Sequence, residues 1–248
     1  MMQRFLAALG CLTIVPVGLR SNIQERELEG SWLWFPIVGL LVGLVLVGAH
    51  TVALRLFPPL VVGACVLLTW IVFTGAIHLD GFADVCDGLY AGHTSQERLR
   101  IMKDPHIGAM AVIGLSGLLL LKFALISSLT QAVVAPTLLL TPCLGRYAMV
   151  ILGTTLPYAR TEAGAAAAFV RHATKGSLVG ATVAVLLIAY LLWRWTGLAL
   201  LGVSVIVSLI LRLVFRRTLG GVTGDALGAA GELTEVLVLL GASLTMSR

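Results

Sequence analysis

Long apolar runs alternate along the chain with short segments that carry most of its charges. Six runs suit a helical crossing of a bilayer, which takes about 20 predominantly apolar residues. A further run, 233–246, is too short unless the stretch from Asp225 joins it, which would place Glu232 and Glu235 at membrane depth. The pattern predicts an all-α, polytopic integral membrane bundle of six to seven transmembrane helices, one domain over residues 1–248. The six runs are 33–54, 58–77, 107–129, 132–156, 177–193 and 197–211.

The first apolar stretch, residues 5–17, is shorter than these runs and lacks the small-residue cleavage site that ends a signal peptide. Acidic residues follow it at Glu25, Glu27 and Glu29, before the first long run. We therefore expect a short interfacial or re-entrant segment and not a removed signal.

Composition agrees with a membrane protein. Hydrophobic residues make up 58% of the chain and charged residues 12%, with a mean hydropathy of +1.00, whereas soluble domains average about 25% charged residues. These figures argue against a soluble globule and a disordered chain. The four cysteines form no C-x-x-C pair, so neither a zinc site nor a disulfide framework is indicated.

Lys and Arg alternate between rich and poor segments along the chain. By the positive-inside rule the rich segments lie in the cytoplasm, which predicts a cytoplasmic N-terminus and, after a seventh crossing, an external Arg248. The basic residues flank apolar runs, so the net charge of +5 does not indicate a nucleic-acid partner. Each rich segment holds three basic residues: Arg4, Arg20 and Arg26; Arg98, Arg100 and Lys103; Arg160, Arg171 and Lys175; and Arg212, Arg216 and Arg217. The poor segments hold Arg55 alone, Arg194 alone or no basic residue.

Three aspartates follow the second run with helical spacing. Asp80, Asp84 and Asp87 stand at i, i+4 and i+7, which brings them onto one stripe of a helix. Acidic side chains near hydrocarbon cost about 2.5 to 3.5 kcal/mol each unless a cation or water compensates. Hard carboxylate oxygens suit Mg²⁺, which also binds substrate phosphates. The spacing therefore favours a Mg²⁺ site over a solvated loop with idle aspartates.

A basic cluster comes next in the chain. Arg98, Arg100 and Lys103 lie on the same expected face as the aspartates, with Asp104 directly after them. Alone, such a cluster is more often a topology determinant, but beside an acidic metal site it suits phosphate binding.

Two cations lie inside apolar runs, and the C-terminal segment carries acids. Lys122 and Arg146 should face the bundle interior and pair with an acid or a phosphate, or else snorkel to the interface. Asp225, Glu232 and Glu235 follow a glycine-rich segment whose small residues allow close approach to a ligand or to a neighbouring helix. His78 is a weaker candidate, as a general base, a metal ligand or a structural residue.

Several separate blocks of the chain resemble the cobalamin synthase family, the adenosylcobinamide-GDP ribazoletransferases. The longest is His78-Leu79-Asp80-Gly81-Phe82-Ala83-Asp84-Val85-Cys86-Asp87-Gly88, and the segment from Thr223-Gly224-Asp225 through Glu235 is also specific. Shorter blocks, specific only in combination, are residues 12–17, 35–40, 101–104 and Tyr158-Ala159-Arg160.

The resemblance implies a transferase that completes cobalamin biosynthesis. Such an enzyme joins adenosylcobinamide-GDP to alpha-ribazole or its 5'-phosphate, releases GMP, requires Mg²⁺ and gives adenosylcobalamin or its phosphate. It also implies a multi-pass protein of a bacterial or archaeal cytoplasmic (inner) membrane, embedded in the lipid bilayer, with its active site on the cytoplasmic side. A homo-oligomer is possible, because Gly39-x-x-x-Gly43 could pair helices.

On this basis we expect Asp80, Asp84 and Asp87 to hold Mg²⁺, with Asp80, Asp84 or His78 in a catalytic role. The substrate contacts expected are Arg98, Arg100, Lys103, Asp104, Arg146, Asp225, Glu232 and Glu235.

Three other functions compete with this interpretation. Residues 84–91 fit the opening D-x-x-D-G-x-x-A of CDP-alcohol phosphotransferases, but Gly92 follows where that family has Arg, and no later aspartate pair appears. A UbiA-like prenyltransferase would need a second aspartate-rich motif, which is not visible. An ion-coupled transporter should show two related halves, and the sequence has no internal symmetry.

Overall fold

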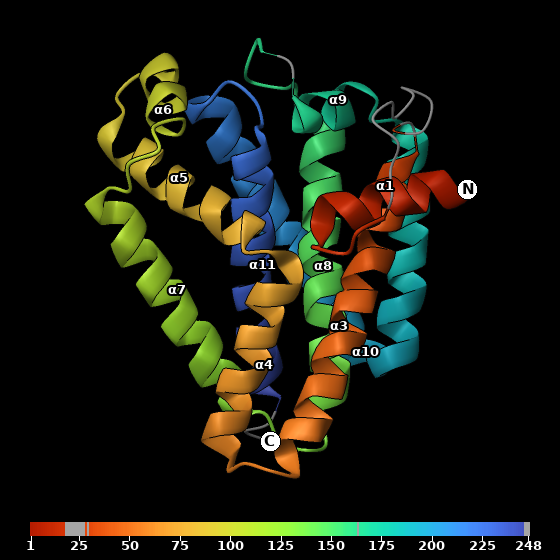
Figure 1. The fold of residues 1–248 in the computed structure, drawn as a ribbon. Helices are drawn as coiled ribbons and strands as arrows, with labels where there is room; N and C mark the ends of the chain where they lie inside the picture. Colours follow the sequence, from red (N-terminus) through yellow and green to blue (C-terminus); the bar gives the residue numbers. More distant parts are fainter. Residues whose placement is uncertain (18–27, 29, 163, 246–248) are drawn as a thin grey trace.

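The structure, a computed structural model, describes residues 1–17, 28, 30–162 and 164–245 (Figure 1). Within these ranges the chain is helical, and its only extended pairing is an isolated bridge between Tyr158 and Val222. The predicted all-α class is confirmed. The elements are α1 (Met2–Leu12), η1 (Ser31–Trp34), α3 (Phe35–Leu54), α4 (Pro59–Thr74), α5 (Ile77–Ala91), α6 (Ser95–Ile101), α7 (Ala109–Ser128), α8 (Val134–Thr155), α9 (Ala165–Arg171), α10 (Lys175–Thr218) and α11 (Gly224–Leu244).

Five of the described helices are long and apolar enough to cross a membrane, or six if the bent pair α4 and α5 forms one span. α3, α7 and α8 match three of the predicted runs closely. α11 is a continuous helix of 21 residues, so the stretch from Asp225 does join the last apolar run, and Glu232 and Glu235 are buried within it. The multi-pass prediction is therefore confirmed, while the orientation of the N-terminus remains a prediction.

α10 consists of two helical segments joined at a sharp bend. Trp193 and Arg194 leave helical backbone angles, and Arg194 has a φ of 48°. A Cβ on Gly197 would lie 2.0 Å from the Ala189 carbonyl oxygen, so the chain folds back on itself at this point. This agrees with the two runs, 177–193 and 197–211, that the sequence predicts on either side of a tight turn.

The predicted run 58–77 ends early, because the chain turns sharply after Thr74. Gly75 and Ala76 both adopt left-handed backbone conformations, with φ of 63° and 55°. The bend between α4 and α5 is 89°, so α5 runs across the bundle near one end (Figure 1).

α8 occupies the centre of the bundle and packs against α3, α10 and α11. Gly39 and Gly43 lie where α3 meets it, since a Cβ on either would come within 2.4 to 2.6 Å of the carbonyl oxygens of Pro142 and Leu138. The small-residue motif therefore serves packing within this chain, which removes the support it gave to a homo-oligomer.

Both cations inside the apolar runs find acidic partners in the interior. The Lys122 Nζ lies 2.6 Å from Glu232 and 2.5 Å from Glu235, and Arg146 pairs with the other Glu235 oxygen. Lys122 also lies over the Trp70 ring, 4.3 Å from its centroid. All four charged side chains are at most 5% exposed, and their formal charges cancel. The prediction that these cations face the interior is confirmed.

The short helices α6 and α9 lie at the same end of the bundle as α5, whereas the α3–α4 and α7–α8 connections lie at the opposite end (Figure 1). The first apolar stretch forms α1, a short apolar helix at the α5 end. Several residues of the sequence predictions lie outside the described ranges: Arg20, Glu25, Arg26, Glu27, Glu29, Met246 and Arg248.

Candidate active site

The site begins where α5 crosses the start of α11. A Cβ on Gly81 would lie 2.7 Å from the Asp225 Cα, and one on Gly228 would lie 3.0 Å from the His78 Cα. Glycine is needed at both positions because the two backbones are in contact. The crossing brings the aspartates of α5 next to Asp225 in the first turn of α11. Of the two partners that the sequence allows for the glycine-rich segment, a ligand or a neighbouring helix, Gly228 contacts a neighbouring helix.

Asp80 and Asp84 lie one turn apart on α5, and in the part of the chain that the structure describes their carboxylates accept no hydrogen bond and form no ion pair. Asp80 is exposed and Asp84 is half-buried. The charges that act most strongly on Asp84 are the carboxylates of Asp225 and Asp80, which the Arg160 guanidinium partly offsets. A cation bound among Asp80, Asp84 and Asp225 would reduce the repulsion between these carboxylates.

Asp87, the third aspartate, has a different role in this structure. Its carboxylate accepts hydrogen bonds from the backbone N–H groups of Gly108, at 2.7 Å, and Ala111, at 2.8 Å. It therefore caps the start of α7, where unpaired N–H groups and the helix dipole favour a negative charge. Both of its oxygens are engaged by the fold.

The donor set fits Mg²⁺ in part. Among the described residues, no three His, Cys, Asp or Glu side chains stand together as a complete ligand group. Mg²⁺ in phosphate-handling sites, however, binds one or two carboxylates and takes its other ligands from water and substrate phosphates. Asp80 and Asp84, which have no other partner here, suit that arrangement.

Arg160 is held against Asp225 by a short contact between two loops. The Ala159 N–H donates to the Val222 carbonyl and the Val222 N–H donates to the Pro157 carbonyl, each at 2.9 Å. This bridge places the Arg160 guanidinium 2.7 Å from the Asp225 carboxylate. Arg160 thus ties the segment after α8 to the first turn of α11.

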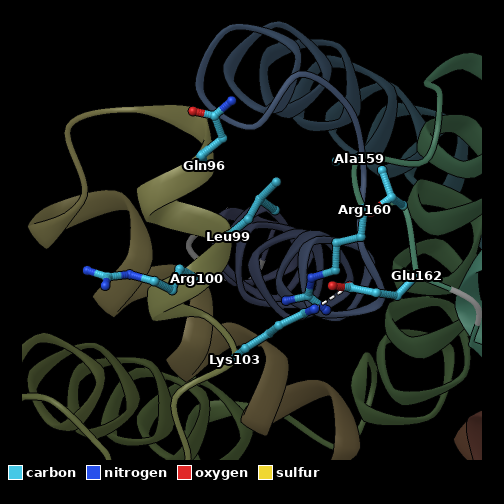
Figure 2. A pocket seen from close by; sticks show the side chains of 8 residues that line it. Gln96, Leu99, Arg100, Lys103, Ala159, Arg160 and Glu162 are labelled. Carbon is cyan, nitrogen blue, oxygen red and sulfur yellow. Dashed lines mark hydrogen bonds and ion pairs between the residues drawn. The ribbon is translucent and has the colours of Figure 1, made fainter.

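A cavity of about 340 Å³ opens beside this pair and is lined by cations. Lys103, Arg160 and Glu162 converge on it, whereas the Arg100 side chain extends in the other direction (Figure 2). Lys103 pairs with Glu162, and this hydrogen bond lowers the pKa of the Glu162 carboxyl. Lys103 and Arg160 thus present cationic groups to this cavity, whereas Arg100 contributes to its edge with its guanidinium turned away.

A second cavity, of about 220 Å³, lies next to it along α5. Its lining includes all three α5 aspartates together with Lys103 and Asp104, so acidic and basic groups share one hollow. Asp104 is exposed and accepts a hydrogen bond from the His106 N–H, which lowers the pKa of its carboxyl. Of the predicted basic cluster, Lys103 therefore lies beside the aspartates.

Arg98, by contrast, faces backbone carbonyls. It donates through Nε to the Gly92 carbonyl at 3.0 Å and through Nη1 to the Thr218 carbonyl at 3.2 Å. It joins the end of α5 to the end of α10, so its contacts here are structural and not directed to a cavity.

His78 is buried and accepts a hydrogen bond at Nδ1 from the Arg146 guanidinium, at 3.2 Å. Since arginine can only donate, Nδ1 must be the unprotonated nitrogen and Nε2 carries the hydrogen. A His78 in this state donates from Nε2 and has no free nitrogen to accept a proton. The geometry favours the aspartates over His78 as proton acceptors.

Three expected substrate contacts lie in the interior network instead. Arg146, Glu232 and Glu235 form ion pairs with one another or with Lys122. They line neither the basic cavity nor the cavity along α5. Arg146 reaches the site only through His78.

Arg160 and Glu162 are the site residues that sequence reasoning missed. Both follow α8 in a loop, where spacing gives no helical face to assign them to. The sequence indication for Arg160 is that Tyr158-Ala159-Arg160 is one of the short blocks that, in combination, resemble the family.

Comparisons with known proteins agree over the full chain. The sequence model of the cobalamin-5-phosphate synthase family matches residues 4–243. The chain is 37% identical over 240 residues to an adenosylcobinamide-GDP ribazoletransferase of Chlorobium phaeobacteroides, covering 96% of each protein. It is 39% identical to the protein of that name from Pseudomonas syringae pv. syringae, covering 96% of this chain and 98% of the relative. No solved structure matches significantly.

Proposed function

Because the chain belongs to the cobalamin-5-phosphate synthase family, we propose that it is an adenosylcobinamide-GDP ribazoletransferase, which performs the final assembly step of cobalamin biosynthesis. The observation that carries this proposal is the match to this family over residues 4–243. It favours this function over a CDP-alcohol phosphotransferase, a UbiA-like prenyltransferase or a transporter.

The reaction transfers a phosphoryl-linked corrinoid between two oxygens. A ribose hydroxyl of alpha-ribazole, or of its 5'-phosphate, forms a new P–O bond to the phosphate that carries the cobinamide. The P–O bond to the GMP phosphate breaks, and the hydroxyl proton passes to a base. The step needs the diphosphate charge to be neutralised and the hydroxyl to be aligned.

The residues of the site divide between these two needs. Lys103 and Arg160 line the basic cavity, where they suit the phosphate oxygens of the donor. Asp80 and Asp84 would hold Mg²⁺, and the metal when bound supplies further neutralisation of the diphosphate. The hydroxyl proton would pass to a carboxylate oxygen of Asp80 or Asp84 that is not bound to the metal, since His78 holds its own hydrogen on Nε2 and both Asp87 oxygens accept backbone N–H groups.

We further propose that the site lies on the cytoplasmic side of a bacterial or archaeal inner membrane. What supports this is that Arg98, Arg100, Lys103 and Arg160 all occur at the α5 end of the bundle, together with the N-terminus.

The test is a GMP-release assay with the purified protein in detergent or nanodiscs. Adenosylcobinamide-GDP, alpha-ribazole and Mg²⁺ should together give GMP and adenosylcobalamin in equal amounts, and omitting either substrate should give neither. Removing divalent ions with EDTA should stop the reaction, and excess Mg²⁺ should restore it. No GMP from the complete mixture would contradict the function, whereas undiminished activity in EDTA would contradict only the metal.

A further inference from the structure

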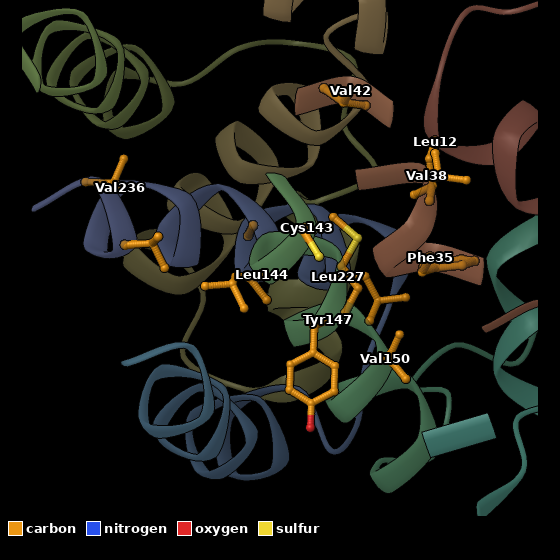
Figure 3. Close-up of a cluster of buried hydrophobic side chains, with 14 of the residues drawn as sticks. Leu12, Phe35, Val38, Val42, Cys143, Leu144, Tyr147, Val150, Leu227 and Val236 are labelled. Carbon is orange, nitrogen blue, oxygen red and sulfur yellow. The ribbon is translucent and has the colours of Figure 1, made fainter. Parts of the chain in front are cut away.

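A third cavity, of about 220 Å³, lies on the other side of the crossing between α5 and α11. Unlike the two charged cavities it is walled by large apolar side chains, with Trp32, Phe35 and Phe169 among them. Apart from the Cys11 thiol, its polar side chains are His78, Asp80 and Asp225, where α5 meets α11. Phe35 and Leu227, from α3 and α11, lie around α8 in Figure 3.

The aromatic wall is built rigidly. Trp32 is fully buried, and its Nε1–H donates to the Phe169 carbonyl at 2.8 Å. Its ring centroid lies 4.6 Å from that of Phe35, and the Phe35 and Phe169 centroids are 5.8 Å apart. A Cβ on Gly153 would lie 2.2 Å from the Trp32 ring, so glycine is required there for the ring to fit. The wall is therefore preformed for a flat apolar group.

The polar end of this cavity adjoins the proposed phosphate site. Asp80 lines both this cavity and the acidic cavity along α5. Asp225 lines it as well, and its partner Arg160 lines the basic cavity. A molecule with a flat apolar part in the aromatic cavity would therefore present its polar part close to the diphosphate.

We propose that the aromatic cavity binds the base of the acceptor nucleoside, an apolar bicyclic base of the benzimidazole type, with its ribose directed to Asp80. This inference rests on the proposed function and deepens it. The guanine of the donor is a poorer occupant, because its several polar edge groups would lose hydrogen bonds among these apolar side chains. A corrin ring is too large for a cavity of about 220 Å³. His78 adds one N–H donor to the lining, which suits the single unsubstituted ring nitrogen of a benzimidazole nucleoside.

Filling the cavity tests the inference. Ala166 lines it, whereas Ala168, two residues along the same short helix, does not. Ala166→Leu should raise the KM for alpha-ribazole by about tenfold or more, equivalent to about 1.4 kcal/mol of binding, and leave the KM for adenosylcobinamide-GDP within about twofold. Ala168→Leu, the matched control, should leave both values near those of the unchanged protein.

A binding measurement separates this inference from the proposed function. Calorimetric titration of the purified protein with alpha-ribazole alone should show binding, which Ala166→Leu weakens by the same factor and Ala168→Leu does not. Phe169→Leu, which keeps the wall apolar but removes a ring, should also weaken it.

If the unchanged protein releases GMP but Ala166→Leu alters both KM values equally or neither, the cavity does not bind the base and the function stands. Titrations that give the same affinity for all variants would also overturn the inference. If the complete mixture yields no GMP, the proposed function fails, while the titration still decides whether the cavity binds the nucleoside.

Discussion

Asp80 and Asp84 are set apart from the other carboxylates of the site by what they contact. Asp87 accepts two backbone N–H groups of α7, and Asp225 is paired with Arg160. Asp80 and Asp84 have no partner among the described residues, although each lies near other negative charges. A carboxylate without a hydrogen-bond or ion-pair partner in such surroundings is a candidate functional group, because the fold compensates its charge only in part.

Replacing Asp80 or Asp84 should therefore remove activity without removing the fold. Asp80→Asn and Asp84→Asn should each lower the rate of GMP release on the order of 100-fold or more, because they lose a ligand to the phosphate-neutralising cation. The thermal midpoint should stay near that of the unchanged protein or rise slightly, since a repulsive charge is gone.

Glu97→Gln is the matched control for this pair. Glu97 is an acid on the neighbouring α6 whose carboxylate accepts a hydrogen bond from the His93 N–H, a bond that glutamine can also accept. The Glu97→Gln variant should release GMP at a rate within about twofold of that of the unchanged protein, as expected for a surface substitution. Full activity in Asp80→Asn would show that this carboxylate is no metal ligand.

The interior network of Lys122, Arg146, Glu232 and Glu235 should affect stability and not the catalytic step, because its buried charges compensate one another. Glu235 is buried against both Lys122 and Arg146. Glu235→Gln should leave an uncompensated buried positive charge and lower stability by about 3 to 5 kcal/mol, measured as the thermal midpoint in detergent. Glu162→Gln, which breaks the exposed pair with Lys103, should barely move that midpoint. Equal midpoints for the two variants would contradict a structural role for the network.

At this scale the sequence identified residue types better than their partners. The cost of unpaired charge in a bilayer was enough to predict that Lys122 and Arg146 turn inward and find acids. It could not distinguish an acid from a substrate phosphate as the partner of Arg146, nor a substrate from a buried cation as the partner of Glu232 and Glu235. Arg98 is a phosphate-binding candidate because it belongs to a basic cluster next to the aspartates, and sequence cannot show that two backbone carbonyls engage it.

Among the helices, the crossing of α5 and α11 determines the site. Gly81 allows the two backbones to touch, and the nearest atoms to a Cβ there belong to the Asp225 backbone, which cannot move aside as a side chain can. Gly81→Ala should push α5 from α11 and lower the rate of GMP release by about tenfold or more, since displacements near 1 Å are costly in catalysis. The rate is measured at saturating substrates, with the thermal midpoint as a check on folding.

Gly117→Ala provides the comparison, because Gly117 lies in the helix α7 and a Cβ there meets nothing within 4 Å. This variant should keep its activity and gain slightly in stability, as alanine is the better helix former. If Gly81→Ala were as active as Gly117→Ala, close contact at the crossing would not matter for catalysis.

Helix positions were largely predictable, because apolar length is a direct consequence of bilayer thickness. The bend after Thr74 was not, since apolar residues continue through Ile77 while Gly75 and Ala76 turn the backbone. The regular spacing of Asp80, Asp84 and Asp87 did predict one helix correctly. It could not show that Asp87 is occupied by the N–H groups of a different helix.

For the whole molecule, the basic residues Arg98, Arg100, Lys103 and Arg160 occur at the same end as the site. This arrangement predicts that the turn at Trp195 and the α6 residue Gln96 lie on opposite sides of the membrane. In a variant without the four native cysteines, Gln96→Cys should react with an impermeant maleimide only in inside-out vesicles, and Trp195→Cys only in intact cells. The reverse result would overturn the cytoplasmic orientation, and labelling of both on one side would overturn the arrangement of the spans.

The right-angle turn between α4 and α5 has a consequence for how reactants arrive. The proposed cytoplasmic placement of the α5 end of the bundle would set the α5 carboxylates against water and not against acyl chains. A bulky, multiply charged nucleotide conjugate could dock from the aqueous phase without ever being dehydrated by lipid. The bilayer would then serve this protein as an anchor that fixes where the final ligation happens, and the finished product could leave by the route through which its precursors came.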